Sequence, residues 1–208
     1  MNILIIDDHR IFSAGLTFLL DDISPNSHIT KEVSCEDAIK NHTAKHTPDL
    51  ILLDYNLPGA HGEQSLALIK GAFPSAIVVI LSSEESHDII HSMIKNGAAG
   101  YIPKSSDPTL FEHALKLVLI GGTYLPPQAF DTMGRRIQVA DTKALTERQT
   151  QVLRHAISGK TNKVIAIELG IAEGTVKSHL SSAYEVMGVK NRTEAVLIAA
   201  KFGMAKQI

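Results

Sequence analysis

The chain has 208 residues, of which 44% are hydrophobic and 20% are charged, and its formal net charge is −2. Its single cysteine, Cys35, excludes an intramolecular disulfide bond, and no apolar run has the form of a signal peptide or the length of a membrane span. We therefore expect a cytoplasmic protein that forms one large or two modest domains.

Four short apolar runs in the first half of the chain each end at a polar group. The runs cover residues 2–6, 50–53, 76–81 and 100–103, and they end at Asp7 with Asp8, at Asp54, at Ser82 with Ser83, and at Lys104. Apolar runs that alternate with helical patterns predict an α/β fold with a parallel sheet buried on both faces. Ligand sites in such sheets lie beyond the carboxyl ends of the strands, so we expect these polar groups to meet in one crevice.

The predicted crevice contains three carboxylates, which indicates a bound cation. Asp7, Asp8 and Asp54 would repel one another and raise each other's pKa unless a positive ion neutralised them. Oxygen ligands favour a hard cation, and we expect Mg²⁺. Asp7 and Asp8 hold this ion directly or through water, and the backbone carbonyl of Asn56 is a further ligand.

The same crevice suits phosphoryl transfer, in which catalysis consists mostly of positioning and charge neutralisation. We assign Asp54 as the nucleophile, because a carboxylate can form an aspartyl phosphate. Ser82 is expected to donate a hydrogen bond to one phosphoryl oxygen, and Lys104 to pair with another. The alternative is that strand ends simply carry polar residues and that Lys104 is a solvated surface lysine.

Three motifs in this half resemble the receiver domain of bacterial two-component response regulators. They are Ile-Asp7-Asp8-His9, Leu-Asp54-Tyr-Asn-Leu-Pro58-Gly59 and Gly100-Tyr101-Ile-Pro-Lys104. The resemblance implies a doubly wound five-stranded sheet over residues 1–121, and a phosphoryl group that reaches Asp54 from a phosphohistidine on a sensor histidine kinase. It also implies that Ser82 and Tyr101 form a switch pair, with Ser83 standing where alanine is frequent.

Six histidines show no spacing that converges on a metal ion, and we expect surface or helix-capping roles for them. They are His9, His28, His42, His46, His87 and His91.

A boundary is predicted near Gly121 and Gly122. The preceding helix begins at Asp107 and Pro108, and Pro126 and Pro127 cannot continue it. Residues 122–143 are expected to form a linker whose polar part, residues 134–143, is mobile.

The charge changes sign at this boundary. Residues 1–122 contain 8 Lys and Arg against 15 Asp and Glu, whereas residues 123–208 contain 12 against 7. An acidic half followed by a basic half favours different partners, with nucleic acid a candidate for the second.

Four short helices are predicted in residues 144–208. Thr146 caps the first helix and Asn162 caps the second. The third helix covers residues 175–187 and leaves a polar face outward, and Asn191 opens the fourth. Two helices joined by a tight turn and followed by a polar-faced third match a helix-turn-helix arrangement.

Residues 145–148, 159–166, 175–179 and 191–195 resemble the LuxR-type DNA-binding domain. Together with the receiver motifs, they indicate a NarL/FixJ-type response regulator with its recognition helix at residues 175–184. The expected DNA contacts are base-edge contacts from Lys177 and Ser178, backbone contacts from Lys163, Thr175 and Arg192, and further contacts from the outward Ser181 and Ser182.

Three positions depart from the family pattern. Ala172 stands where a serine usually caps the recognition helix, Ser181 where relatives can carry a basic contact, and Val186 where lysine is common. Fewer cations predict a weaker dependence of DNA binding on salt.

We expect a transcriptional regulator rather than an enzyme, whose receiver catalyses only its own phosphorylation and dephosphorylation. Phosphorylation of Asp54 would free the recognition helix and promote a homodimer on paired promoter half-sites of double-stranded DNA. One alternative is a receiver that acts as a phosphate sink or protein-interaction module beside a helical domain that does not bind DNA. Another is a phosphatase of the haloacid dehalogenase type, which usually has an acidic residue two positions after its nucleophile, where Asn56 stands here.

Overall fold

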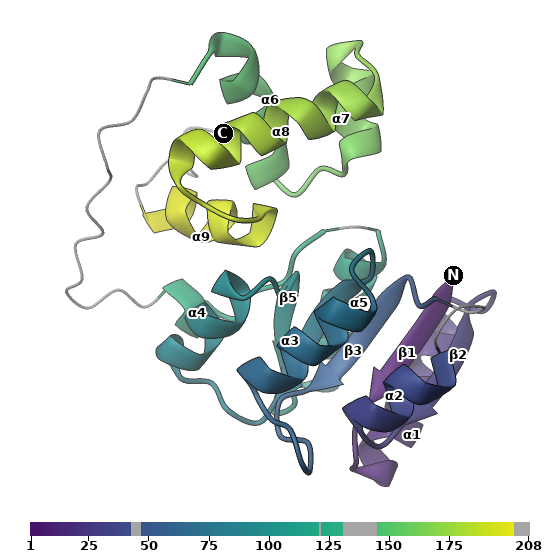
Figure 1. The fold of residues 1–208 in the computed structure, drawn as a ribbon. Coiled ribbons are helices and arrows are strands. Elements are labelled where there is room, and N and C mark those ends of the chain that lie inside the picture. Colours follow the sequence, from purple (N-terminus) through teal and green to yellow (C-terminus); the bar gives the residue numbers. More distant parts are fainter. Residues whose placement is uncertain (43–46, 121, 131–144, 202–208) are drawn as a thin grey trace.

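The structure is a computed structural model in which residues 1–42, 47–120, 122–130 and 145–201 are described (Figure 1). Its first half contains one sheet of five parallel strands in the order β2-β1-β3-β4-β5. The strands are β1 (Asn2–Ile6), β2 (His28–Glu32), β3 (Leu50–Asp54), β4 (Ile77–Ser82) and β5 (Gly100–Pro103). The predicted doubly wound parallel sheet is confirmed.

The register of the strands brings their carboxyl ends to one edge. Ile6 pairs with Leu53, Asp54 with Leu81, and Ser82 with Pro103. The polar groups that follow β1, β3 and β5 therefore lie beside one another, as the sequence pattern predicts.

Helices cover both faces of the sheet, which explains why the central strands are apolar throughout. One face packs against the first and fifth helices of the receiver and the other against the second, third and fourth. These helices are α1 (Arg10–Ile23), α2 (Cys35–His42), α3 (Glu63–Ala72), α4 (His87–Lys95) and α5 (Pro108–Leu119).

Residues 122–130 pack onto the receiver, although the sequence suggests a linker there. The N–H of Tyr101 donates to the carbonyl of Tyr124, so this segment runs beside β5. The 3-10 helix η1 (Pro127–Phe130) then lies against α4, where a ring nitrogen of His91 is 2.9 Å from the carbonyl of Ala129. The predicted mobile stretch at residues 134–143 lies outside the described residues.

The second half forms a compact helical body around one apolar cluster. Its helices are α6 (Glu147–Ile157), α7 (Asn162–Leu169), α8 (Glu173–Met187) and α9 (Arg192–Lys201). Four helices are confirmed, and α8 begins two residues earlier than predicted. Among the described residues, none of the helices is long and apolar enough to cross a membrane.

Two of the three caps expected from the sequence are found in the structure. Thr146 and Gln149 form the capping box of α6, and the Asn191 side chain accepts a hydrogen bond from the third residue of α9. Asn162 was wrongly expected to cap α7. It lies inside the helix, because the Thr161 hydroxyl accepts from the Val164 N–H instead.

Ala172 occupies the N-cap position of α8 with an extended backbone (φ −69°, ψ 148°) and offers no side-chain cap. An Ala172→Ser substitution should supply the missing acceptor and stabilise the helical domain by about 1 kcal/mol. Denaturant unfolding of the full chain measures this change.

Thr161→Ala is the matched control, because it removes a hydroxyl that does cap a helix of the same domain. It should destabilise by a similar amount. Equal stability of Ala172→Ser and wild type would show that the start of α8 does not need a cap.

Candidate functional site

The crevice at the carboxyl edge of the sheet holds two buried carboxylates around one lysine. Asp7 and Asp54 are each 2% exposed, and the Nζ of Lys104 lies 2.8 Å from an Oδ2 of each. Lys104 is held from the other side by the ring of Phe12, whose centroid is 4.7 Å from Nζ. The expected meeting of Asp7, Asp54 and Lys104 is confirmed, and the reading of Lys104 as a solvated lysine is wrong because its side chain is only 11% exposed.

Burial raises the pKa of Asp54 above its ordinary value, and the Asp7 carboxylate adds to the rise. Lys104 and the Asn56 N–H, which donates to Asp54 Oδ1 at 3.3 Å, oppose it. Desolvation is the largest of these effects, so the site favours the neutral form of Asp54 over the ionised carboxylate. A bound cation or a covalent phosphoryl group would both change that balance.

One face of the crevice can hold a metal ion. Oxygens of Asp7, Asp8 and Asp54 and a ring nitrogen of His9 all lie within 4.8 Å of one another. Ligands on opposite sides of Mg²⁺ are about 4.2 Å apart, so these atoms need to move by only a few tenths of an ångström to share one small ion. Asp8 is exposed, so this face of the crevice is open to water.

His9 corrects one sequence-based expectation. It was grouped with histidines that converge on no metal site, yet its Nδ1 lies 2.9 Å from Asp8 and 3.5 Å from Asp54. The His9 N–H donates to Asp7 Oδ1 at 2.8 Å, and this bond turns the chain after β1. The turn brings the His9 ring beside the carboxylates.

Ser82 and Tyr101 are both fully buried and are joined through Glu84. The Ser82 hydroxyl accepts from the Glu84 N–H at 2.9 Å, and the Tyr101 hydroxyl donates to the Glu84 carbonyl at 2.5 Å. Burial raises the pKa of Tyr101 to about 12, so this hydroxyl remains a donor at neutral pH. Ser83, by contrast, is exposed.

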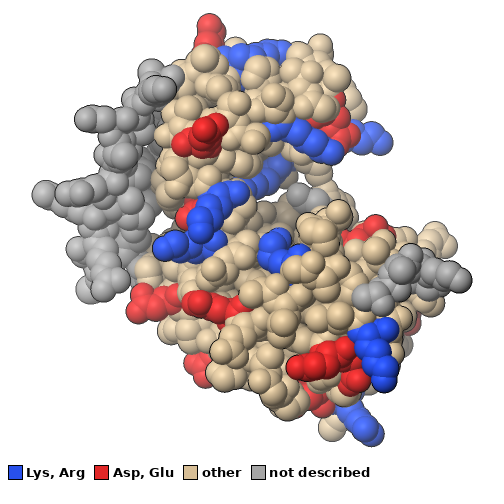
Figure 2. All heavy atoms as spheres, viewed as in Figure 1, with Lys and Arg blue, Asp and Glu red and all other residues tan. Residues whose placement is uncertain are grey.

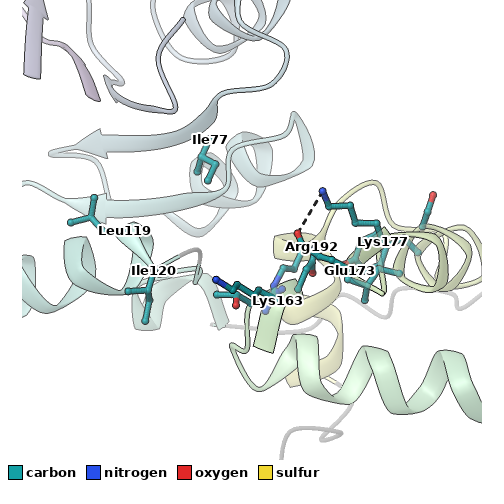
Figure 3. Close-up of a pocket in the computed structure, with 12 residues that line it drawn as sticks. Ile77, Leu119, Ile120, Lys163, Glu173, Lys177 and Arg192 are labelled. Carbon is teal, nitrogen blue, oxygen red and sulfur yellow. Dashed lines mark ion pairs between the residues drawn. The ribbon is translucent and has the colours of Figure 1, made fainter. Parts of the chain in front are cut away.

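The second candidate site is a basic surface on the helical domain that faces the receiver. Figure 2 shows Lys and Arg side chains gathered where the two bodies meet. A cleft of about 760 Å³ lies between the receiver and the helical domain. Ile77, Leu119 and Ile120 form its wall on the receiver side (Figure 3). Its other wall includes four of the predicted DNA contacts, namely Lys163, Lys177, Ser181 and Arg192.

The side chains predicted to contact DNA differ in their exposure and in the bonds that they already make within the protein. Lys177 is 66% exposed and makes only a 3.7 Å ion pair with Glu173, one turn before it (Figure 3). Arg192 donates to the carbonyls of Ala156 and Lys160 at 2.7 Å each, and burial lowers its pKa. Thr175 and Ser178 are exposed on α8 and Ser182 is half-buried, but these three do not line the cleft.

Two protein families match the chain, one for each body. Residues 3–116 match the response regulator receiver domain, and residues 143–199 match the bacterial regulatory proteins of the luxR family.

Individual relatives match along nearly the whole chain. The glycerol metabolism activator of Pseudomonas putida is 37% identical over 95% of this chain and 94% of its own. A probable transcriptional regulatory protein NarL of Mycobacterium tuberculosis is 29% identical over 94% and 91%.

Among solved structures, RcsB of Salmonella enterica serovar Typhimurium, bound to promoter P1flhDC with the phosphomimetic BeF3⁻, is 26% identical. It covers 97% of this chain and 98% of its own, with a TM-score of 0.54.

Replacement of Asp54 by asparagine should stabilise the protein at pH 7 in the absence of divalent ions. Because the folded state raises the pKa of Asp54, its carboxyl stabilises the fold below the unfolded pKa and loses that contribution as pH rises through the folded pKa. At pH 7 the neutral amide removes this penalty, so the melting temperature of Asp54→Asn should be higher than that of the wild type.

Calorimetry with chelator present measures the shift, with Asp21→Asn on the exposed surface of α1 as the control that should not change. A lower melting temperature for Asp54→Asn would mean that the ion pair with Lys104 outweighs desolvation.

Proposed function

Because the chain belongs to the two-component response regulators that carry a LuxR-type DNA-binding domain, we propose that phosphorylation of Asp54 controls its binding to promoter DNA. The observation that carries this proposal is the buried Asp54 carboxylate beside Lys104 and a second buried carboxylate. The family is one of transcription regulators and not of conventional enzymes.

Asp54 is the phosphoacceptor in this proposal. An Oδ of Asp54 attacks the phosphorus of a phosphohistidine on a sensor kinase, a new O–P bond forms, and the N–P bond to the imidazole breaks. Lys104 then pairs with a phosphoryl oxygen, since its Nζ already lies 2.8 Å from Asp54. Ser82 turns its hydroxyl toward another phosphoryl oxygen, with Ser83 at the mouth of the site.

We assign Mg²⁺ to the acidic face of the crevice, held by Asp7, Asp8, Asp54 and the backbone carbonyl of Asn56. The cation neutralises the negative charge of the transferred group and of the carboxylates. Oxygen donors in this number suit a hard divalent ion, and the spacing of the carboxylates supports the assignment.

The helical domain is the proposed DNA reader, with α8 as its recognition helix. Lys177 and Ser178 contact base edges, while Lys163, Thr175 and Arg192 contact phosphates; Ser181 and Ser182 complete the surface. Promoter binding by RcsB, a relative 26% identical over nearly the whole chain, supports this assignment.

The arrangement of the two bodies supports control by the receiver. Lys163 and Lys177 face a cleft whose volume is that of a small-molecule pocket, about 300–1,000 Å³. A recognition helix needs a DNA groove along its exposed face, and the receiver wall of the cleft obstructs a duplex there, although Lys177 itself is 66% exposed to water. Phosphorylation therefore acts by separating the bodies.

We further propose a homodimer on paired half-sites when the protein is phosphorylated or bound to DNA, since two-fold DNA sites suit a symmetric dimer. We also propose that the protein acts in the cytoplasm, because bacterial promoter DNA lies there. The division into a receiver (1–121), a linker (122–143) and a DNA-binding domain (144–208) belongs to the same proposal.

Incubation with Mg²⁺ and acetyl phosphate should add one phosphoryl group to the wild type and none to Asp54→Asn. Intact mass spectrometry measures the addition, and the mass should return to its starting value as the acyl phosphate hydrolyses. Addition to both proteins would place the phosphoacceptor elsewhere.

Lys163→Ala should weaken binding of the phosphorylated protein to a random-sequence DNA duplex, because Lys163 is exposed on the cleft wall and is assigned to the phosphate backbone. Loss of one phosphate contact should reduce the slope of log K against log salt by about 0.9. Fluorescence anisotropy at several salt concentrations measures the slope.

Lys190→Ala is the control, because Lys190 is exposed on the same domain but does not line the cleft. The same loss of slope in both variants would count against a DNA-binding role for the cleft-facing surface of the helical domain.

A further inference from the structure

The helical domain contacts the receiver through its last described helix. In Figure 1, α9 lies between the rest of the helical domain and the receiver, and it packs against α4 and η1. Leu197 of α9 is only 5% exposed and belongs to the same apolar cluster as Met93 and Ile94 of α4. The receiver therefore covers part of a helix that belongs to the other domain.

Two side chains at the start of α9 donate hydrogen bonds to the receiver backbone. Asn191 Nδ2 lies 3.0 Å from the carbonyl oxygen of Ile94, and Thr193 Oγ1 lies 3.1 Å from that of Ala99. Thr193 is 3% exposed, so its hydroxyl has little access to water. Both donors are neutral and both acceptors are main-chain carbonyls.

The two acceptors flank the segment that joins α4 to β5. Ile94 is in the last turn of α4, where carbonyl groups carry partial negative charge, and its carbonyl also accepts from the Gly97 N–H at 2.9 Å. Ala99 directly precedes β5, and its N–H donates to Val78 of β4. The contact therefore depends on the position of α4 relative to the sheet.

A continuous set of contacts links this segment to the crevice. Ser82 and Tyr101 meet at the two main-chain groups of Glu84, and Tyr101 belongs to the same apolar cluster as Ile94 and Leu197. A change at Ser82 that moves Tyr101 or the segment after β4 changes the surface on which α9 rests. Because hydrogen bonds weaken steeply once donor and acceptor separate, a small shift of α4 suffices to break this contact.

We propose that Asn191 and Thr193 form a latch that holds the helical domain on the α4–β5 segment, and that phosphorylation releases it. This inference rests on the proposed role of Asp54 and identifies the contact through which that role reaches the DNA-binding surface. Coupling between two sites is reciprocal. If phosphorylation of Asp54 weakens the latch, then a substitution that weakens the latch also makes phosphorylation more favourable.

Two substitutions remove the latch while leaving α9 intact. Asn191 also caps α9, because its Oδ1 accepts from the Glu194 N–H at 2.8 Å. Asn191→Asp keeps that acceptor, since aspartate caps as well as asparagine, but it loses the donor to Ile94. Thr193→Val keeps the shape of the side chain and loses only the hydroxyl.

Thr150→Val is the matched control. The Thr150 hydroxyl donates at 3.0 Å to the carbonyl of Thr146, the N-cap residue of α6, so this substitution removes a similar bond that does not reach the receiver.

The test uses the full unphosphorylated chain and two measurements. Each latch substitution should tighten binding to a random-sequence duplex by roughly two- to tenfold, because it raises the fraction of open protein. The double variant should also show a larger radius of gyration in small-angle X-ray scattering. Thr150→Val should match the wild type, and acetyl phosphate with Mg²⁺ should bring the wild type to the level of the variants.

The outcomes separate the latch from the function on which it rests. Variants as compact as the wild type and with the same DNA affinity would overturn the latch, whatever phosphorylation does. If the variants open and the wild type stays closed after stoichiometric phosphorylation, the latch stands and the proposed switch fails. Helical content by circular dichroism should be equal in all variants, which shows that α9 is retained.

Discussion

The ion pairs of Lys104 with Asp7 and Asp54 are the interaction on which the rest of the site depends. Two buried carboxylates at neighbouring strand ends repel each other, and the one ammonium group at 2.8 Å from both makes their proximity tolerable. The compensation is incomplete, since burial still raises the pKa of Asp54. The crevice therefore favours a further positive charge, which would also neutralise the acyl phosphate, a mixed anhydride, that Asp54 would form.

The parallel register makes this arrangement possible. Strands that run the same way end at the same edge, so a polar residue after each apolar run reaches the crevice without any long-range signal in the sequence. This is why Asp7, Asp54, Ser82 and Lys104 could be placed together from four short runs. The sequence of β2 contains no apolar run of this kind. This strand lies at the edge of the sheet, and its five residues are only partly buried or exposed.

Features that depend on contact between distant segments could not be predicted. His9 follows Asp7 and Asp8 directly in the chain, but it comes within 3.5 Å of Asp54 only because the chain turns after β1, and a single histidine carries no spacing signal. Asn191 was recognised as a helix cap from its local pattern, but nothing local indicates that its amide also meets the last turn of α4. Residues 122–130 look like a linker by composition, yet Tyr124 pairs with β5.

The structure joins the two sites physically. The crevice is linked through Ser82, Glu84 and Tyr101 to the α4–β5 segment, and α9 rests on that segment. The basic surface of the helical domain faces the receiver across the cleft. A change of charge at Asp54 can therefore alter access to the basic surface of the helical domain.

The most direct test of the account is the affinity of one protein sample for a DNA duplex before and after phosphorylation of Asp54, at a fixed salt concentration. The account predicts tighter binding by the phosphorylated sample and a return to weak binding once the phosphoryl group hydrolyses. Equal affinity in both states, with full phosphorylation verified by mass, would contradict it.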